Sequence, residues 1–216
     1  MSDSTGKRFS DLPVREFLDD LASGAPVPGG GAGAALSAAA GAALVAMCCN
    51  LTIGREKYAA VEAEMRDTAS RLDELRVRLL DLLEADTRVY SQVMAAYRLP
   101  RATADEKAAR TAAIQSALKA ASDVPHEMAR VCRDVLALAP AVAAKGNASA
   151  VSDAGVGAVL AHAGLESAAQ NVLINLGSIR DAAYVAARGE ELAALRAAGL
   201  ALHDETLRSV ESRIGG

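Results

Sequence analysis

The segment PVPGGGAGAALSAAAGAALVAMCC, residues 26 to 49, decides the fold of this chain because it carries no charge and consists mostly of glycine, alanine and serine. The eighteen residues from Ala32 to Cys49 are enough to cross a bilayer, but such small side chains gain little free energy on transfer to hydrocarbon. A helix buried on all sides in a soluble protein has the same pattern. We therefore predict a core helix from about Gly31 to Thr52 that stops near Gly54, and no membrane span.

The composition indicates one all-α domain. The chain has 216 residues, of which 51% are hydrophobic and only 3% aromatic, so the core must be built from alanine, leucine and valine. The formal charge is −4, and the 23 lysines and arginines are spread among acidic residues, which disfavours binding to nucleic acid. We expect residues 1–9 to form a disordered tail and residues 10–216 to form a single-domain bundle of about six helices, including long kinked ones.

The cysteines and the N-terminus indicate a cytoplasmic protein. Cys48, Cys49 and Cys132 form an odd set in nonpolar surroundings, which is typical of reduced, buried thiols. The first eleven residues lack the nonpolar core of a secretory signal.

The third helix has the clearest periodicity, and we expect it to begin at Arg55 and Lys57. Nonpolar or nearly nonpolar residues recur at alternating spacings of three and four over about five heptads, which predicts a long helix with a packing seam. The seam consists of Tyr58, Val61, Met65, Thr68, Leu72, Leu75, Leu79, Leu82, Asp86, Val89, Val93 and Ala96. Asp86 is the exception, because a carboxylate in a seam must find partners or accept a raised pKa.

Capping signals place the ends of the earlier helices. We expect Ser10 to cap a first helix that has Pro13 in its opening turn and ends near Ser23. Thr103 and Glu106 match the T-x-x-E capping box and begin the fourth helix.

Similar signals place the later boundaries. Pro125 is expected to kink the fourth helix, and Lys145-Gly146-Asn147 is expected to end it in a left-handed conformation. Ser152 should cap the fifth helix, and the last helix should run from about Glu190 to Ser212.

The histidines do not indicate a metal site. His126, His162 and His203 are single and far apart, without the spacing of a metal site. The glycine triplet lacks the lysine of a P-loop and the preceding strand of a dinucleotide fingerprint, so we expect neither a metal nor a nucleotide cofactor.

Polar residues at nonpolar positions remain as candidates for a binding site. Asn171 and Asn175 share one helical face, Asn147 and Asp153 flank the start of that helix, and the exposed N–H groups of residues 29–31 could receive an anionic or carbonyl group. The alternative is that the glycines only let helices pack and that the asparagines join interhelical hydrogen bonds.

Several separated motifs resemble the cyclodeaminase/cyclohydrolase family of folate enzymes. In chain order they are VREFLDDLASGAPVPGGGAGAAL, LTIGREKY, LEADTRVY, LPRATADEK, KGNASAVSD and NVLINL, and they cover nearly the whole chain. The resemblance implies an all-α homodimer that binds tetrahydrofolate in a cleft near the subunit contact.

The resemblance also implies roles for individual residues. Asp86 matches the acidic residue that the family is thought to use in chemistry, while Arg55 and Lys57 match a basic loop suited to the glutamyl tail of folate. Ala32 and Gly33 depart from the family, which usually has serine and a bulkier residue there, so no contact through a serine hydroxyl is expected. The implied substrate-binding set is Pro28, Gly29, Gly30, Gly31, Arg55, Lys57, Tyr58, Asn147, Asp153, Asn171 and Asn175.

Two reactions of folate one-carbon units suit these residues. An ionised Asp86 could stabilise the cation of 5,10-methenyltetrahydrofolate and accept a proton from water during hydrolysis to 10-formyltetrahydrofolate. A protonated Asp86 could instead release ammonia from formiminotetrahydrofolate. We favour hydrolysis, because the chain lacks a formiminotransferase domain. A third hypothesis is a non-catalytic helical dimer that binds folate or a partner protein.

Overall fold

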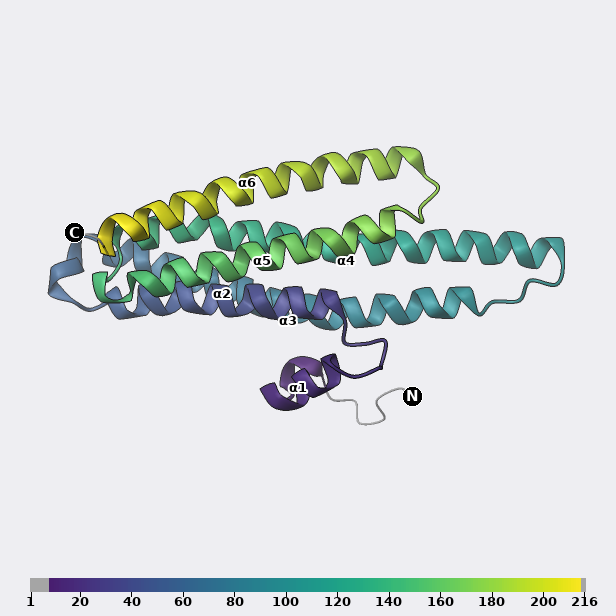
Figure 1. Ribbon diagram of the computed structural model, residues 1–216, viewed down its shortest axis with the longest axis horizontal. Coiled ribbons are helices and arrows are strands. Elements are labelled where there is room, and N and C mark those ends of the chain that lie inside the picture. Colours follow the sequence, from purple (N-terminus) through teal and green to yellow (C-terminus); the bar gives the residue numbers. More distant parts are fainter. Residues whose placement is uncertain (1–7, 215–216) are drawn as a thin grey trace.

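The computed structural model describes residues 8–214, which form a helical bundle without strands (Figure 1). Three short 3-10 helices, η1 to η3, accompany six α-helices, so the predicted all-α fold of about six helices is confirmed. The elements in chain order are η1 (Phe9–Asp11), α1 (Val14–Leu21), α2 (Gly30–Thr52), η2 (Glu56–Val61), α3 (Glu62–Tyr97), α4 (Ala104–Lys145), η3 (Ala148–Ala150), α5 (Val151–Leu176) and α6 (Ala182–Ile214).

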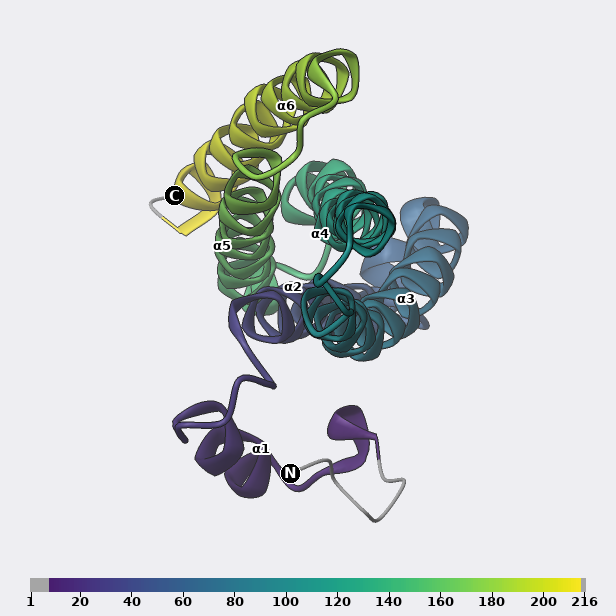
Figure 2. The same cartoon turned by 90° about the vertical axis from the view of Figure 1, so that its right-hand side faces the viewer.

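The core of the bundle is the close antiparallel pair of α2 and α5. A Cβ added at Gly41 would lie 2.6 Å from the Gly157 carbonyl oxygen, so the two backbones approach too closely for any larger residue there. Towards the other end of the pair, Gly30 of α2 faces Asn171 of α5. Helix α4 packs against α5, and α6 covers both on the side opposite α3 (Figure 2).

The predicted core helix is confirmed as α2. It is the one described helix that is long and nonpolar enough to cross a membrane, but 61% of its most nonpolar window is buried inside the bundle. Cys48 and Cys49 on this helix and Cys132 on α4 are buried free thiols, as predicted.

The predicted seam of α3 is also confirmed. Its members Met65, Leu72, Leu79 and Leu82 are buried. The capping box at the start of α4 is formed as expected, since Thr103 Oγ1 accepts from the Glu106 N–H at 3.1 Å and a Glu106 carboxylate oxygen accepts from the Thr103 N–H at 3.1 Å. Helix α4 continues through Pro125 and Pro140.

Both predicted serine caps are wrong. Ser10 lies inside η1, where its N–H donates to Glu84 of α3 at 2.8 Å, and α1 begins only after Pro13. Ser152 lies within α5, which starts one residue earlier, at Val151, after the short helix η3. In both places a short 3-10 helix precedes the α-helix, and it includes Ser10 in the first case and ends two residues before Ser152 in the second.

Two other boundaries and the conformation at one helix end also differ from the predictions. The chain around Tyr58 forms η2, with φ −114° and ψ 15° at Tyr58, so α3 begins at Glu62 rather than at Arg55. Helix α4 ends at Lys145 as predicted, but Gly146 is extended, with φ −67° and ψ −177°, and not left-handed. Its N–H donates to Val142 O at 2.8 Å, and the chain then enters η3. The last helix starts at Ala182, eight residues before the predicted start.

The N-terminal segment packs on one side of the bundle, where Phe17 of α1 is buried. Residues 1–7 of the predicted tail lie outside the described part of the chain, and Phe9 begins η1. An ion pair of 2.7 Å between Arg8 and Asp81 holds η1 against α3. Helix α1 lies beyond it, to one side of the bundle in both views (Figures 1 and 2).

Candidate active site

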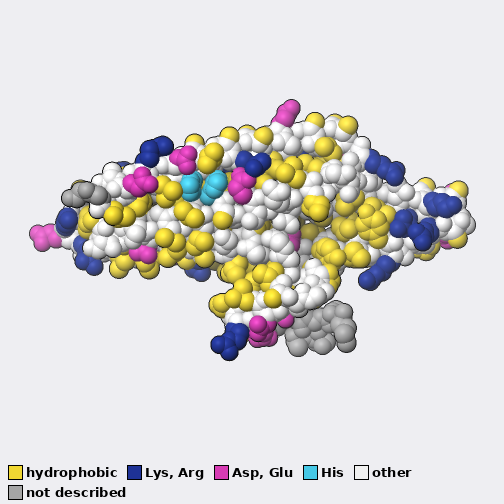
Figure 3. Space-filling model, in the orientation of Figure 1, with side chains coloured by type: hydrophobic (Ala, Val, Ile, Leu, Met, Phe, Trp, Pro, Cys, Tyr) yellow, Lys and Arg dark blue, Asp and Glu magenta, His cyan; other side chains and the backbone are white. Residues whose placement is uncertain are grey.

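A cavity of about 370 Å³ lies where the N-terminus of α2 meets α3, α4 and α5. Figure 3 shows a hollow on this side of the molecule, near the connection between α1 and α2. The cavity brings together six of the residues predicted from the sequence, namely Gly29, Gly30, Gly31, Asp86, Asn171 and Asn175. Its other lining residues are Pro26, Val27, Val89, Tyr90, Val93, Ala121, Ile174 and Ser178.

Asp86 enters the cavity from α3 and is closely packed against the glycine turn. A Cβ added at Gly31 would overlap the Asp86 carboxyl group, so only glycine leaves room for this side chain. No hydrogen bond or ion pair joins the carboxyl group to any other residue in the range 8–214. Burial raises the pKa of Asp86 above its usual value, because an ionised carboxylate loses water there without gaining a partner.

The N-terminus of α2 supplies N–H donors beside this carboxyl group. The first intrahelical hydrogen bond runs from the Gly33 N–H to Gly29 O at 3.1 Å. The N–H groups of residues 30–32 therefore have no acceptor within the helix. The positive end of the helix also favours the ionised form of a nearby acid.

Two asparagines of α5 present oxygen atoms to the cavity. Asn171 Nδ2 donates to Ser167 O at 2.9 Å, and Asn175 Nδ2 donates to both Asn171 O and Ala121 O, at 2.8 and 3.0 Å. Because backbone carbonyls hold the amide nitrogens, both Oδ1 atoms stay available as acceptors. Within the described chain neither Oδ1 atom receives a hydrogen bond.

Sequence reasoning missed part of the cavity wall. Tyr90 lies four residues after Asp86, so the helical period could have placed it on the same face of α3. Ile174, which is 75% exposed, lies at the rim and follows Asn171 by three residues. Ala121 and Ser178 carried no signal that separates them from ordinary packing positions.

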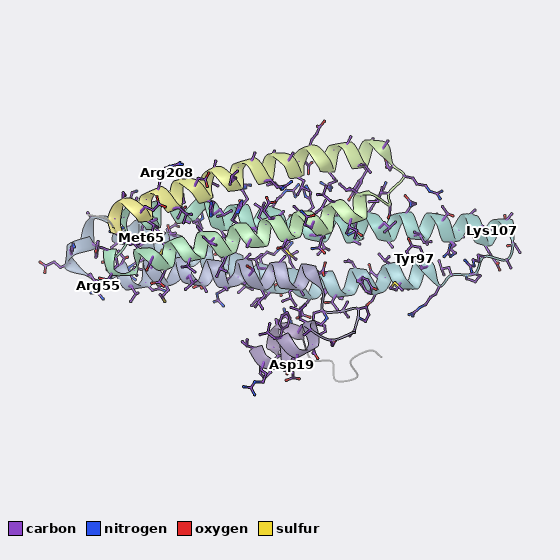
Figure 4. The ribbon with its side chains drawn as sticks, viewed as in Figure 1. Asp19, Arg55, Met65, Tyr97, Lys107 and Arg208 are labelled. Atoms are coloured by element: carbon purple, nitrogen blue, oxygen red, sulfur yellow. The ribbon has the colours of Figure 1, made fainter. Side chains whose placement is uncertain are left out.

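The other predicted residues lie at the opposite end of the α2–α5 pair. Figure 4 labels Arg55 at this end, close to Met65. Here the Tyr58 hydroxyl accepts from the Ala148 N–H at 3.0 Å, and Asn147 Nδ2 donates to Leu51 O at 2.9 Å. The Asn147 side chain also caps η3 by accepting from the Ser149 N–H.

The predicted site is therefore divided within one chain. Helix α2 has 23 residues, which corresponds to a length of about 34 Å. This length separates the Asp86 cavity from Arg55, Lys57 and Tyr58. Asn147 and Asp153 lie at the far end too, because α5 runs antiparallel to α2.

Three residues next to the glycine turn do not line the cavity. Pro28 is buried. Ala32, which stands where the resemblance predicts a serine, is fully buried in the core. A Cβ at Gly33 would meet open space, so a bulkier residue could be accommodated there.

The arrangement is rich in oxygen acceptors and contains no basic side chain. Three acceptor groups, the carboxyl of Asp86 and the amide oxygens of Asn171 and Asn175, line one cavity. Such a site suits a cationic ligand that also carries N–H donors. Within residues 8–214 no cluster of three or more histidine, cysteine or acidic side chains could hold a metal ion.

Comparisons with known proteins identify the family. The model of the formiminotransferase-cyclodeaminase family matches residues 13–194. A methenyltetrahydrofolate cyclohydrolase of Methylorubrum extorquens is 48% identical over 201 residues, which is 93% of this chain and 97% of that protein.

Two further relatives carry the cyclodeaminase name. The formimidoyltransferase-cyclodeaminase of Rattus norvegicus is 33% identical over 79% of this chain, which spans only 32% of the rat protein. The crystal structure of a formiminotetrahydrofolate cyclodeaminase from Thermotoga maritima superposes with a TM-score of 0.85 at 32% identity, and the match covers 94% of this chain and 98% of that one.

Proposed function

Because the chain belongs to the formiminotransferase-cyclodeaminase family of enzymes, we propose that it hydrolyses 5,10-methenyltetrahydrofolate to 10-formyltetrahydrofolate in the Asp86 cavity. The observation that carries this proposal is the unpaired, half-buried carboxyl group of Asp86 at the N-terminus of α2. The near full-length match to a methenyltetrahydrofolate cyclohydrolase supports the choice of substrate.

The substrate supplies the positive charge that the cavity lacks. In 5,10-methenyltetrahydrofolate the carbon between N5 and N10 belongs to a cationic amidinium group. The ionised carboxyl of Asp86 stabilises this cation, while the oxygens of Asn171 and Asn175 accept hydrogen bonds from the N–H groups of the pterin. Substrate binding thus compensates for the burial of the Asp86 charge.

Asp86 also moves the protons of the reaction. The carboxylate accepts a proton as a water oxygen bonds to the amidinium carbon, which gives a neutral tetrahedral adduct. The bond from this carbon to N5 then breaks, N5 takes up a proton, and the hydroxyl becomes the formyl oxygen on N10. One proton is released to solvent overall.

Formiminotetrahydrofolate cyclodeamination is the second candidate. In that reaction N10 attacks the formimino carbon on N5 and ammonia leaves, so the site must donate a proton to nitrogen. The raised pKa of Asp86 favours this role, because burial disfavours the ionised carboxylate relative to the protonated acid that donates the proton. The Thermotoga maritima relative bears the name of this activity.

Assembly and location follow from the same resemblance. We propose that the protein is a cytoplasmic homodimer that needs no metal or nucleotide cofactor. Family membership favours an enzyme over the non-catalytic folate-binding dimer.

The test is turnover by the purified protein and by the Asp86→Asn variant. The wild type should consume 5,10-methenyltetrahydrofolate, followed by the loss of its absorbance, and Asp86→Asn should lower kcat about 100-fold or more. Ammonia release from formiminotetrahydrofolate, assayed in parallel, distinguishes the two reactions. Unchanged turnover by Asp86→Asn would remove this residue from the mechanism.

A further inference from the structure

Two of the three histidines of the chain meet between α5 and α6. His162 lies on α5 and His203 lies on α6, and the centroids of their rings are 4.8 Å apart, with an angle of 32° between the ring planes. Figure 3 shows histidine side chains together at the surface, with acidic side chains beside them. The sequence predicted isolated histidines because these two are far apart in the chain, and the fold brings them into contact.

Close packing of α5 against α6 fixes the position of both rings. On one side of the histidine pair, a Cβ added at Gly199 would lie 2.7 Å from Leu165 Cδ1. On the other side, a Cβ added at Gly155 would lie 3.2 Å from Val210 Cγ2. Side chains carried by helices in such close contact are held more precisely than side chains on loops.

Each ring has a nitrogen atom without a partner in the described chain. The Nε2 atom of His162 is buried and forms no hydrogen bond to any residue in the range 8–214. In His203 the Nδ1 atom lies 2.9 Å from Asp204 Oδ1. A carboxylate only accepts hydrogen bonds, so Nδ1 is the donor and the lone pair of the His203 ring lies on Nε2.

This arrangement is typical of histidines that bind a metal ion. In metal sites one ring nitrogen commonly donates to a carboxylate, which orients the other ring nitrogen towards the metal. Two imidazoles that bind one ion at about 2.1 Å, with a nearly tetrahedral angle between them, have ring centroids roughly 5 Å apart. The observed separation of 4.8 Å is close to this value.

The charges around the histidine pair favour a cation. The charges that act on His162 include the carboxylates of Glu166 and Asp204 and the guanidinium of Arg196. Arg196 already forms an ion pair of 2.6 Å with Glu166. Within residues 8–214 no lysine or arginine pairs with Asp204, so these three groups carry one net negative charge.

We propose that His162 and His203 bind a divalent transition metal ion between α5 and α6, with water completing the coordination and Asp204 positioning the His203 ring. Imidazole ligands suit Zn²⁺, Cu²⁺ and Ni²⁺, whereas Mg²⁺ and Ca²⁺ prefer oxygen ligands. The protein supplies two ligands, fewer than the three or four of catalytic and structural zinc sites. The ion is therefore bound reversibly, and it holds α6 to α5.

The metal site is separate from the Asp86 cavity and does not rest on the proposed function. His162 precedes Asn171 by nine residues on α5, which corresponds to about 14 Å along the helix. Metal binding should therefore stabilise the contact between the two helices without being required for turnover.

Calorimetric titration of the tag-free protein with ZnCl₂ tests the site. The wild type should bind one Zn²⁺ per chain, and His162→Gln and His203→Gln should each raise the Kd at least tenfold. His126→Gln is the matched control, because it removes a histidine of α4 that is not part of the pair, and its Kd should equal that of the wild type. A wild type that binds no Zn²⁺, or binding that survives both substitutions in the pair, would overturn the proposal.

Co²⁺ gives a spectroscopic signature of the same ligands. Its visible absorption should change on addition of the wild type and stay that of the free ion with His162→Gln or His203→Gln. The same spectrum with all three proteins would place the ion elsewhere.

Asp204→Asn tests the positioning role of the carboxylate. The Asp204 side chain is 49% exposed, so the Tm without metal should change little, whereas the Kd for Zn²⁺ should rise about tenfold. An unchanged Kd would remove Asp204 from the site.

Thermal unfolding shows whether the ion holds the two helices together. At a Zn²⁺ concentration about 100-fold above the Kd, the Tm of the wild type should rise by roughly 5–10 °C. His162→Gln and His203→Gln should show no such rise at the same concentration. An equal rise in these variants would show that the stabilising ion binds outside the histidine pair.

Discussion

The two ends of the α2–α5 pair differ in how they use their polar groups. At the Asp86 end, a carboxyl group and two amide oxygens face a cavity without a partner in the described chain. At the Arg55 end, Asn147 and Tyr58 hold neighbouring segments together through hydrogen bonds to Leu51, Ser149 and Ala148.

This difference separates residues kept for a ligand from residues that maintain the fold. A buried polar group without a partner costs free energy of folding, whereas the same group with a partner stabilises the fold. Asp86 and Asn147 therefore match motifs of the same family for different reasons. The first should govern turnover and the second should govern stability.

The largest expected effect in this comparison comes from displacing Asp86 without changing it. In Gly31→Ala the added methyl group would overlap the Asp86 carboxyl, so the side chain must move, and kcat should fall by roughly 100-fold. Gly33→Ala is the matched control, because its methyl group points into open space two residues away. Steady-state hydrolysis of 5,10-methenyltetrahydrofolate measures both, and a wild-type kcat in Gly31→Ala would show that the position of Asp86 is not critical.

One asparagine substitution at each end of the α2–α5 pair should have a smaller effect, on activity at the Asp86 end and on stability at the Arg55 end. Asn171→Ala removes an acceptor from the cavity and should lower kcat/KM about tenfold with little change in Tm. Asn147→Ala removes two hydrogen bonds and should cost about 2 kcal/mol, which lowers Tm by roughly 4–8 °C. Kinetics and thermal unfolding of both variants measure the contrast, and the reverse assignment of the two effects would contradict it.

The sequence predicted the features that depend on helical period. The seam of α3 placed Asp86 among buried leucines because a 3.6-residue period fixes which side chains share a face. The capping box at Thr103 was predicted for a similar reason, since all of its atoms lie within four residues. Helix ends that depend on tertiary contacts, such as Ser10 against Glu84 of α3, could not be predicted locally.

The sequence also did not predict that the site residues are divided between the two ends of the α2–α5 pair. Asn147 lies before α5 and Asn171 lies near its end, so most of this helix, Val151–Leu176, separates the surroundings of one residue from those of the other. The separation appears only when α5 packs antiparallel to α2. The hydrogen bonds that occupy Asn147 likewise come from the end of α2, far away in the chain.

The free energy of unfolding of Asp86→Asn, measured against pH, tests most directly whether this carboxyl is kept for the substrate. Burial raises the pKa of Asp86 in the folded protein, so ionisation destabilises the fold. This loss of folding free energy is absent below the pKa of the unfolded chain, about 3.9. It grows as the pH rises from that value to the pKa of the folded protein, and it is complete above the folded pKa.

We expect the Tm of Asp86→Asn to be about 2–4 °C above that of the wild type at pH 7. This difference in Tm should disappear below the unfolded pKa of aspartate. A variant that is less stable than the wild type at pH 7 would show that Asp86 is held by the fold, and would contradict its assignment to catalysis.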